Sequence, residues 1–255
     1  MLWSNNQVNI IGLGRVGTFI RRMMPNARCF VRNDSLVSLS SHPTWICVRM
    51  KDLDQVLQQI PTTSKQNLIF LQNGIYQSLL DDYGVLEPTK MLVYFAINKI
   101  GDTPVDSLGM SVVTGKHSKM VSQMFASWHL DVKPVSELDF YGLAHEKLIW
   151  LAVFGLLGDC FSLTVQDLVT YHRDHIHGLI WELASLVERK FNIHFAGGKN
   201  GLVEGLVQYS HSLGAYRATV KEFHYRNGYF LRLGKTPKHE HFLHLYQQAV
   251  ARKDL

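Results

Sequence analysis

The sequence predicts an α/β protein, with a doubly wound, largely parallel sheet in its first half and helices alone in its second. Three observations lead to this expectation. Short apolar runs alternate with stretches of 3.6-residue apolar spacing as far as residue 135, which is typical of βαβ units. A glycine-rich turn joins the first strand to the first helix. Beyond residue 137 only helical spacing recurs.

The first strand and helix carry the most informative motif of the chain. The apolar run 8–11 leads directly into the pattern Gly12-x-Gly14-x-x-Gly17, and helical spacing follows it. In this context the three glycines allow a tight turn, close approach of a pyrophosphate and close packing of helix on strand. We therefore expect a Rossmann-type dinucleotide site, with a glycine-rich turn that binds nothing as the alternative. The residues expected to contact the cofactor here are Gly12, Gly14, Arg15, Val16 and Gly17.

The end of the second strand indicates which dinucleotide is bound. NAD enzymes usually place an acidic residue about 20 positions on, whereas an arginine there suits the 2′-phosphate of NADP. The residue twenty positions after Gly12 is Arg32, and Asp34 lies close enough to compete for the role. Arg32 favours NADP over NAD.

The remaining elements follow from apolar periodicity. Strands are expected at 8–11, 28–32, 45–48, 67–71, 91–96, 110–114 and 130–135, and helices at 16–24, 52–60, 76–83 and 118–128. A polar loop at 33–43 takes the place of the usual crossover helix. Helices then follow at 138–161, 172–191 and 201–213, with two shorter ones up to 252. We place the domain boundary at residue 135, which gives domains 1–135 and 136–255.

Composition and charge describe an ordinary globular protein of 255 residues, 46% hydrophobic and 18% charged. The net charge of +5 fits an anionic ligand, but the basic residues are scattered and not interleaved with aromatics, so no nucleic-acid partner is expected. Histidines gather at 172–177 and 239–244 without a zinc-enzyme carboxylate motif. We expect surface histidines there and no metal site.

Cysteines and apolar runs bear on the cellular setting. Cys29, Cys47 and Cys160 are far apart and odd in number, which indicates reduced thiols in a cytoplasmic protein. The N-terminal residues lack the basic and apolar regions of a signal peptide. The longest apolar run, 148–158, has 11 residues, well short of the roughly 20 that cross a bilayer. It is expected to be a core helix, and no membrane partner is expected.

Two charged residues of the second half are ambiguous when taken alone. Lys147 is a lone cation at the edge of an apolar helix, where a surface lysine with its stem on apolar neighbours is the simpler interpretation. Glu222 would by default be a solvated carboxylate, and Asn227-Gly228 a turn that ends a helix.

Motifs along nearly the whole chain occur in a recognisable order. They are GLGRVG at 12–17, Arg32 at the end of the second strand, Lys51 after the third, Gln72-Asn73-Gly74 after the fourth, Glu146-Lys147-Leu148 opening an apolar helix, Ser210 twelve residues before Glu222, and KEFHYRNGYFL near the end. Together they resemble the ketopantoate reductase (2-dehydropantoate 2-reductase) family. The order and spacing are far more specific than the glycine motif alone.

The resemblance implies a fold, an activity and a cofactor. It implies NADPH-dependent reduction of a small 2-keto acid, with 2-dehydropantoate as the expected substrate and pantothenate biosynthesis as the expected setting. The first domain would bind NADP and the helical domain would bind substrate. A homodimer is compatible with it. Arg32 and Lys51 would serve the 2′-phosphate side of the cofactor, and Asn73 would lie beside the nicotinamide and the substrate.

The resemblance also implies roles for residues of the helical domain. Lys147 would hydrogen-bond the keto oxygen and stabilise the alkoxide that develops as hydride arrives. Glu222 would bind the substrate hydroxyl and stabilise the charged lysine, while Ser210 would reach the substrate carboxylate.

An alternative stays open, because Leu151, Gly214 and Tyr76 depart from the family pattern. The protein could be an NADP(H)-binding relative that has lost its reaction, or a reductase of another keto or imino acid. The pairing of Lys147 with Glu222 favours an enzyme.

Overall fold

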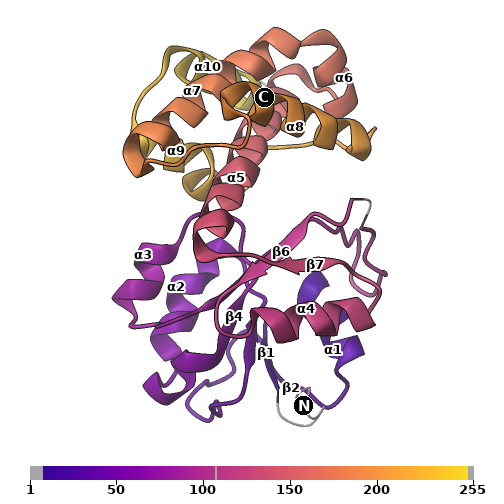
Figure 1. The fold of residues 1–255 in the computed structure, drawn as a ribbon, viewed down its shortest axis with the longest axis vertical. Helices are drawn as coiled ribbons and strands as arrows, with labels where there is room; N and C mark the ends of the chain where they lie inside the picture. The colour runs from indigo at the N-terminus through magenta and orange to yellow at the C-terminus, as the bar shows by residue number, and fades with distance from the viewer. Residues whose placement is uncertain (1–7, 107, 252–255) are drawn as a thin grey trace. The chain divides into compact units, whose positions relative to one another are not determined.

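A computed structural model describes residues 8–106 and 108–251 (Figure 1). The expected N-terminal features at residues 1–7 and the expected helix end at 252 lie outside this range. The chain divides into two compact units, Met1–Tyr141 and Gly142–Leu255, here called unit 1 and unit 2. The domain boundary expected from the sequence is residue 135.

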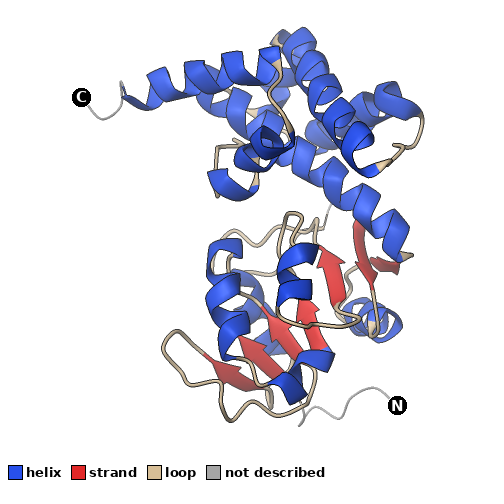
Figure 2. Ribbon diagram, turned by 90° about the vertical axis from the view of Figure 1, so that its left-hand side faces the viewer, coloured by secondary structure: helices blue, strands red, loops and turns tan. Residues whose placement is uncertain are grey.

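Unit 1 contains a sheet, drawn as red arrows in Figure 2. Its described strands run in the order β2-β1-β3-β4-β5-β6-β7. They are β1 (Asn9–Ile11), β2 (Arg28–Phe30), β3 (Thr44–Ile46), β4 (Leu68–Phe70), β5 (Thr89–Leu92), β6 (Ser111–Thr114) and β7 (Val132–Pro134). Neighbouring strands pair in parallel, and only β5 and β6 are antiparallel. The predicted α/β fold with a largely parallel sheet is confirmed. The strands are shorter than the apolar runs that predicted them.

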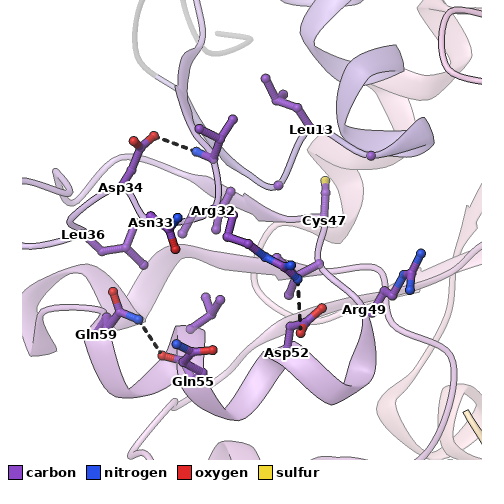
Figure 3. Close-up of a pocket in the computed structure, with 16 residues that line it drawn as sticks. Leu13, Arg32, Asn33, Asp34, Leu36, Cys47, Arg49, Asp52, Gln55 and Gln59 are labelled. Carbon is purple, nitrogen blue, oxygen red and sulfur yellow. Dashed lines mark hydrogen bonds and ion pairs between the residues drawn. The ribbon is translucent and has the colours of Figure 1, made fainter.

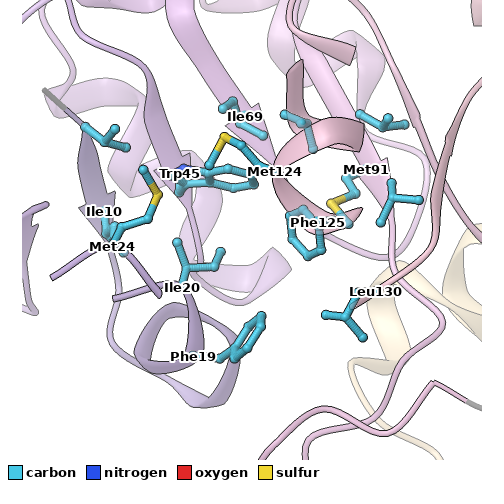
Figure 4. Close-up of a cluster of buried hydrophobic side chains, with 14 of the residues drawn as sticks. Ile10, Phe19, Ile20, Met24, Trp45, Ile69, Met91, Met124, Phe125 and Leu130 are labelled. Carbon is cyan, nitrogen blue, oxygen red and sulfur yellow. The ribbon is translucent and has the colours of Figure 1, made fainter. Parts of the chain in front are cut away.

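Helices cover both faces of this sheet. They are α1 (Arg15–Met23), α2 (Met50–Gln59), α3 (Gln77–Asp82) and α4 (Ser118–Ser127), with a short 3-10 helix η1 (Thr62–Asn67). Successive strand residues point to opposite faces, so Ile10, Trp45 and Ile69 join α1 and α4 in one core cluster (Figure 4). Phe70, next to Ile69, faces the other side and packs against Tyr76, whose ring centroid is 6.0 Å away.

The connection from β2 to β3 shapes the edge of the sheet. Residues 33–43, all within the described chain, form turns and no regular element, as expected. The connection crosses β1, so β2 lies at the edge and β3 on the far side of β1. The strand order therefore reverses at β1 and β3, and open α/β sheets bind their ligands at the carboxyl ends of such strands.

Unit 2 is helical, and no strand occurs in its described residues. Its elements are α5 (Glu137–Phe161, which starts in unit 1), α6 (Val165–Tyr171), α7 (Arg173–Phe191), α8 (Gly198–Leu213), a 3-10 turn η2 (Phe223–Tyr225), α9 (Asn227–Leu233) and α10 (Pro237–Ala251). The predicted all-α second half is confirmed. The separate helix α6 was not predicted.

Helix α5 is the single helix in the described part of the chain that is long and apolar enough to cross a membrane by length and composition alone. This is weak evidence for a span, because 72% of its most apolar window is buried inside the structure. The stretch predicted as a core helix, 148–158, lies within it, and most of its side chains are buried.

Candidate functional site

A cavity of about 440 Å³ lies in unit 1 at the carboxyl ends of β1, β2 and β3 (Figure 3). Its walls are the glycine turn after β1, the loop after β2, the end of β3 and one face of α2 along its whole length. This is the place where the strand order reverses, and it was the expected position of a dinucleotide.

The three glycines of the turn have different surroundings. Gly12 has a φ of +94°, which favours glycine, and a Cβ on Gly17 would lie 1.9 Å from the carbonyl oxygen of Gly12. In contrast, a Cβ on Gly14 would meet nothing within 4 Å. Gly12 and Gly17 therefore shape the turn, whereas Gly14 faces open space in the cavity wall. This arrangement fits the approach of a phosphate to the start of α1.

The side chains of two residues that were expected to contact the cofactor make other contacts instead. Arg15 donates from Nη1 to the carbonyl oxygen of Ile97 at 3.0 Å. Val16 packs against the apolar core of unit 1. Neither residue belongs to the described residues that line the cavity. At these two positions the backbone at the start of α1 remains available to a phosphate, rather than the side chains.

Cations do line the cavity, but they are not the expected pair. Arg32 is there, with a side chain that is 82% exposed and Nη2 3.8 Å from Oδ1 of Asp52. Lys51 is exposed on α2 and does not line the cavity, whereas Arg49, just before α2, does. The sequence contained a signal for Arg49, since it directly follows the apolar run of the third strand. A 3.8 Å surface pair is worth little, so Asp52 holds Arg32 only weakly.

Asp34, the competitor for a ribose contact, has a structural role. Its Oδ2 accepts a hydrogen bond from the backbone N–H of Val31 at 2.7 Å, which closes the turn after β2 (Figure 3). Asn33 in the same turn has a φ of 76°. Asp34 also lines the cavity, so this structural role leaves it at the candidate site.

Gln72 and Asn73 follow β4. Gln72 donates from Nε2 to the carbonyl oxygens of Ile46 and Val48, both at 2.9 Å, and so ties the end of β4 to the end of β3. Asn73 is half-buried and comes directly after this anchor. It does not line the described cavity.

Lys147, in unit 2, lies in a setting unlike that of a surface lysine. The residue is only 7% exposed. Burial lowers the pKa of Lys147 to about 7, and the positive charge of Arg226 adds to the lowering. A strongly shifted pKa with a specific charge partner is typical of functional sites. The simpler interpretation of a solvated surface lysine is wrong.

Glu222 and Arg226 flank one tight turn near Lys147. Arg226 donates from Nη2 to Oε2 of Glu222 at 3.4 Å, and its side chain is 12% exposed. Glu222 has a φ of 45°, a strained value for a residue other than glycine. The structure thus brings Lys147, Glu222 and Arg226 into one cluster. Arg226 was missed in the sequence. The expectation that Asn227-Gly228 ends a helix is wrong, because α9 begins at Asn227.

Ser210 is fully buried between α5 and α8. Its hydroxyl accepts from Nε1 of Trp150 at 2.9 Å and donates to the carbonyl oxygen of Leu206 at 2.8 Å. Trp150 lies one turn after Lys147 on α5 and so shares its face. Binding a substrate carboxylate would require the Ser210 hydroxyl to turn away from Leu206.

Two of the three departures from the family pattern have local explanations in the structure. Gly214 ends α8 with a φ of 54°, a conformation that favours glycine. Tyr76 is buried beside Phe70. Leu151 is half-buried on α5.

The histidines of the two sequence clusters, 172–177 and 239–244, mostly pack their rings against aromatic side chains. Among the described residues, no group of three or more His, Cys, Asp or Glu side chains could hold a metal. His172 stacks on Phe161 with 3.9 Å between ring centroids. His239 is fully buried and shares a 2.9 Å hydrogen bond with Asn227, so it is not the surface residue that was expected.

The fold is similar to that of several solved structures of oxidoreductases. No protein-family model and no curated protein matches the sequence. Among solved structures, a 2-dehydropantoate 2-reductase from Methylococcus capsulatus has a TM-score of 0.75 at 12% identity, covering 96% of this chain and 97% of that one. A D-mandelate dehydrogenase, in a ternary structure with NADH and anilino(oxo)acetate, has a TM-score of 0.74 at 11% identity, covering 97% and 99%.

A third neighbour, the dimeric ketopantoate reductase from Staphylococcus aureus, has a TM-score of 0.67 at 16% identity, covering 96% of this chain and 97% of that one. The TM-scores and coverages of these three structures show a shared fold. The resemblance noted in the motifs is therefore matched by the fold over nearly the whole chain.

Proposed function

We propose that the protein is an oxidoreductase that reduces a small 2-keto acid with NADPH, with 2-dehydropantoate as the first substrate to test. The observation that carries the proposal is buried Lys147, whose pKa is lowered to about 7 beside Arg226. A lysine in this setting suits a reductase, which needs a group that can protonate an oxygen. The glycine turn and cavity of unit 1 support the nicotinamide dinucleotide.

The residues around the cavity fit NADP(H). The open space at Gly14 and the start of α1 would receive the pyrophosphate, and Arg32 with Arg49 would bind the 2′-phosphate. Asp34 and Asp52 in the same wall oppose a phosphate, so the two arginines must outweigh them. When bound, the cofactor supplies a hydride to the keto carbon.

Lys147 would act on the oxygen of the substrate. Its ammonium group donates a hydrogen bond to the keto oxygen and stabilises the negative charge that develops there. Because its pKa is near 7, it can hand over a proton readily at neutral pH. Glu222, four residues before Arg226, would bind the substrate hydroxyl and balance the positive charge of the cluster.

The experiment is NADPH oxidation with 2-dehydropantoate and a panel of other 2-keto acids, alongside NADPH and NADH titration by fluorescence. We expect NADPH to bind more tightly than NADH and at least one keto acid to be turned over. Tight NADPH binding without turnover of any keto acid would contradict the reductase and favour a relative that only binds the cofactor.

A second candidate is a reductase of a different 2-keto acid. The hydroxyl of Ser210 is engaged by Trp150 and Leu206, and Leu151 is apolar, so the substrate side differs from the family pattern. Turnover of another keto acid at a kcat/KM well above that of 2-dehydropantoate would establish this candidate.

A further inference from the structure

We propose that Arg226 binds the carboxylate of the substrate next to Lys147, so that the cluster in unit 2 recognises anionic 2-keto acids. The inference rests on the proposed function and deepens it, because it names the group that selects acids over neutral carbonyl compounds. Neither the motifs nor the comparisons assign Arg226 a role.

The hydrogen bonds of Arg226 leave part of its guanidinium unused. One nitrogen, Nη2, donates to Glu222 over a long 3.4 Å contact. Nε is buried and has no hydrogen-bond partner among the described residues. A buried donor without a partner is costly, and a carboxylate accepts two parallel bonds from a guanidinium. Arg226 therefore has an unsatisfied donor that an anionic ligand would pair, once the ligand displaces the side chains that cover it.

The local charge favours an anion. Lys147 and Arg226 bring two positive charges to a site where Glu222 is the partner carboxylate. Each positive charge disfavours the other, and a substrate carboxylate would relieve that repulsion. The same anion would raise the pKa of Lys147 and keep its ammonium charged when substrate is bound.

The turn that carries Arg226 is held firmly. Backbone N–H groups of Tyr225 and Arg226 donate to the carbonyl oxygens of Glu222 and Phe223, at 2.9 and 3.2 Å. Directly after it, the buried Asn227 is hydrogen-bonded to His239 of α10 at 2.9 Å. Arg226 is thus presented by a fixed turn, which suits a residue that orients a ligand.

The residue expected to bind the carboxylate is less suited to it. Ser210 is fully buried, and its single hydroxyl proton is donated to Leu206. A neutral hydroxyl also binds a carboxylate more weakly than a guanidinium does. Arg226 therefore replaces Ser210 as the carboxylate ligand.

The test compares Arg226→Gln and Arg226→Lys with Arg217→Gln, which removes an arginine from the exposed surface of unit 2. Each protein is assayed with the best 2-keto acid of the panel and with its primary amide. We expect Arg226→Gln to lower kcat/KM for the acid on the order of 10²-fold, mainly through KM, and to change the amide little. Arg226→Lys should fall between, and Arg217→Gln should match wild type.

The outcomes separate the two proposals. If wild type reduces no keto acid, the proposed function and this inference both fail. If wild type is active and Arg226→Gln loses less than tenfold with the acid, the inference alone is overturned. Equal losses for acid and amide, restored together by Arg226→Lys, would show that Arg226 only positions Glu222, which also overturns it. Circular dichroism and unchanged NADPH affinity establish that the variants are folded.

Discussion

Lys147 is an ionisable side chain whose surroundings disfavour its charged, protonated form. Burial removes the water that would solvate the ammonium group, and Arg226 adds a like charge, so the pKa falls to about 7. Near neutral pH the side chain is then divided between its two protonation states. An acid with a pKa close to the working pH transfers its proton efficiently.

Lys147→Met tests this role directly. Methionine has a similar length and no charge, so the buried site should accept it without loss of stability. We expect turnover to fall by a factor on the order of 10² or more, because the donor to the developing oxyanion is gone. NADPH affinity should stay the same. A variant with near wild-type turnover would remove Lys147 from the catalytic residues.

The pH dependence of Lys147 has a definite sign. In the proposed mechanism the protonated form of Lys147 is the active one, so kcat/KM should fall as the pH rises through about 7. Between about 7 and the ordinary value of 10.5, the unfolded chain holds this proton more than the folded one. The Lys147 contribution to the free energy of unfolding therefore rises with pH over that window. Urea unfolding at pH 7 and 9 should show this rise in wild type and less of it in Lys147→Met; identical slopes would contradict the assignment.

Arg32 and Arg49 line the cavity and are proposed to select the cofactor. Arg32→Ala and Arg49→Ala should each weaken NADPH binding roughly tenfold or more and NADH binding little, because only NADPH carries the 2′-phosphate. Lys119→Ala, on the exposed side of α4, is the matched control. Fluorescence titration measures both affinities. Equal losses for the two cofactors would contradict the assignment to NADP.

These residues show what a sequence can reveal at this scale. Lys147 and Glu222 stand out because a motif order marks them, and Arg32 because its distance from Gly12 is fixed. Arg226 does not stand out, because only the fold buries it and brings it to Lys147. The engagement of Ser210 by Trp150 likewise depends on how α5 and α8 pack, which no local pattern contains.

In the turn between β1 and α1, one glycine is required by the packing of the protein and another is not. Gly17 allows α1 to approach the carbonyl of Gly12, and any larger residue would have to push them apart. Gly14 has no such neighbour, so the protein alone does not require glycine there. A requirement for glycine at Gly14 would have to come from the ligand.

The pair Gly14→Ala and Gly17→Ala makes this distinction measurable. Gly14→Ala should keep a wild-type Tm and lose about tenfold or more in NADPH affinity, because its methyl group would occupy the open space. Gly17→Ala should lower Tm by several degrees without cofactor, because backbone must move to clear a 1.9 Å contact. Thermal unfolding and fluorescence titration measure the two effects. Unchanged NADPH affinity in Gly14→Ala would argue against a pyrophosphate at this turn.

The predicted elements of the sheet and of the second half are mostly confirmed, and the errors have physical causes. Strand lengths were overestimated because apolar runs continue past the paired residues into the turns, as at Cys47 after β3. Helix α6 was missed because its seven residues are too few to show clear periodicity. Thr164 caps this helix, because its hydroxyl accepts a hydrogen bond from the backbone N–H of Asp167.

At the scale of the whole molecule, the division into units falls six residues after the expected boundary at 135. The reason is long-range and lies within unit 1. Lys90, buried on β5, forms an ion pair with Glu137 and lies 5.6 Å from the ring centroid of Phe140. These contacts bind the first turn of α5 to the sheet, so the compact unit extends to Tyr141. A change in periodicity marks where helices begin and cannot show which core they join.

If each unit is stabilised by its own core, a ligand of unit 1 should protect unit 1 selectively. Adenosine 2′,5′-bisphosphate carries the 2′-phosphate side of NADP and lacks the nicotinamide. At 100 times its Kd, a ligand bound only to the folded state adds about 2.7 kcal/mol, which slows exchange through unfolding roughly 100-fold. We expect hydrogen exchange to slow by this order in β1, β3 and β4 and to change little in α7 and α8.

Adenosine 5′-monophosphate, which lacks the 2′-phosphate, is the control and should protect the same strands more weakly at equal concentration. Equal slowing in both units would show that they unfold together and would argue against independent domains. Equal protection by the two nucleotides would instead count against the 2′-phosphate site at Arg32 and Arg49. The two nucleotides differ only in the 2′-phosphate, which Arg32 and Arg49 are proposed to bind. Stronger protection by the bisphosphate would therefore locate the choice of cofactor in unit 1 itself.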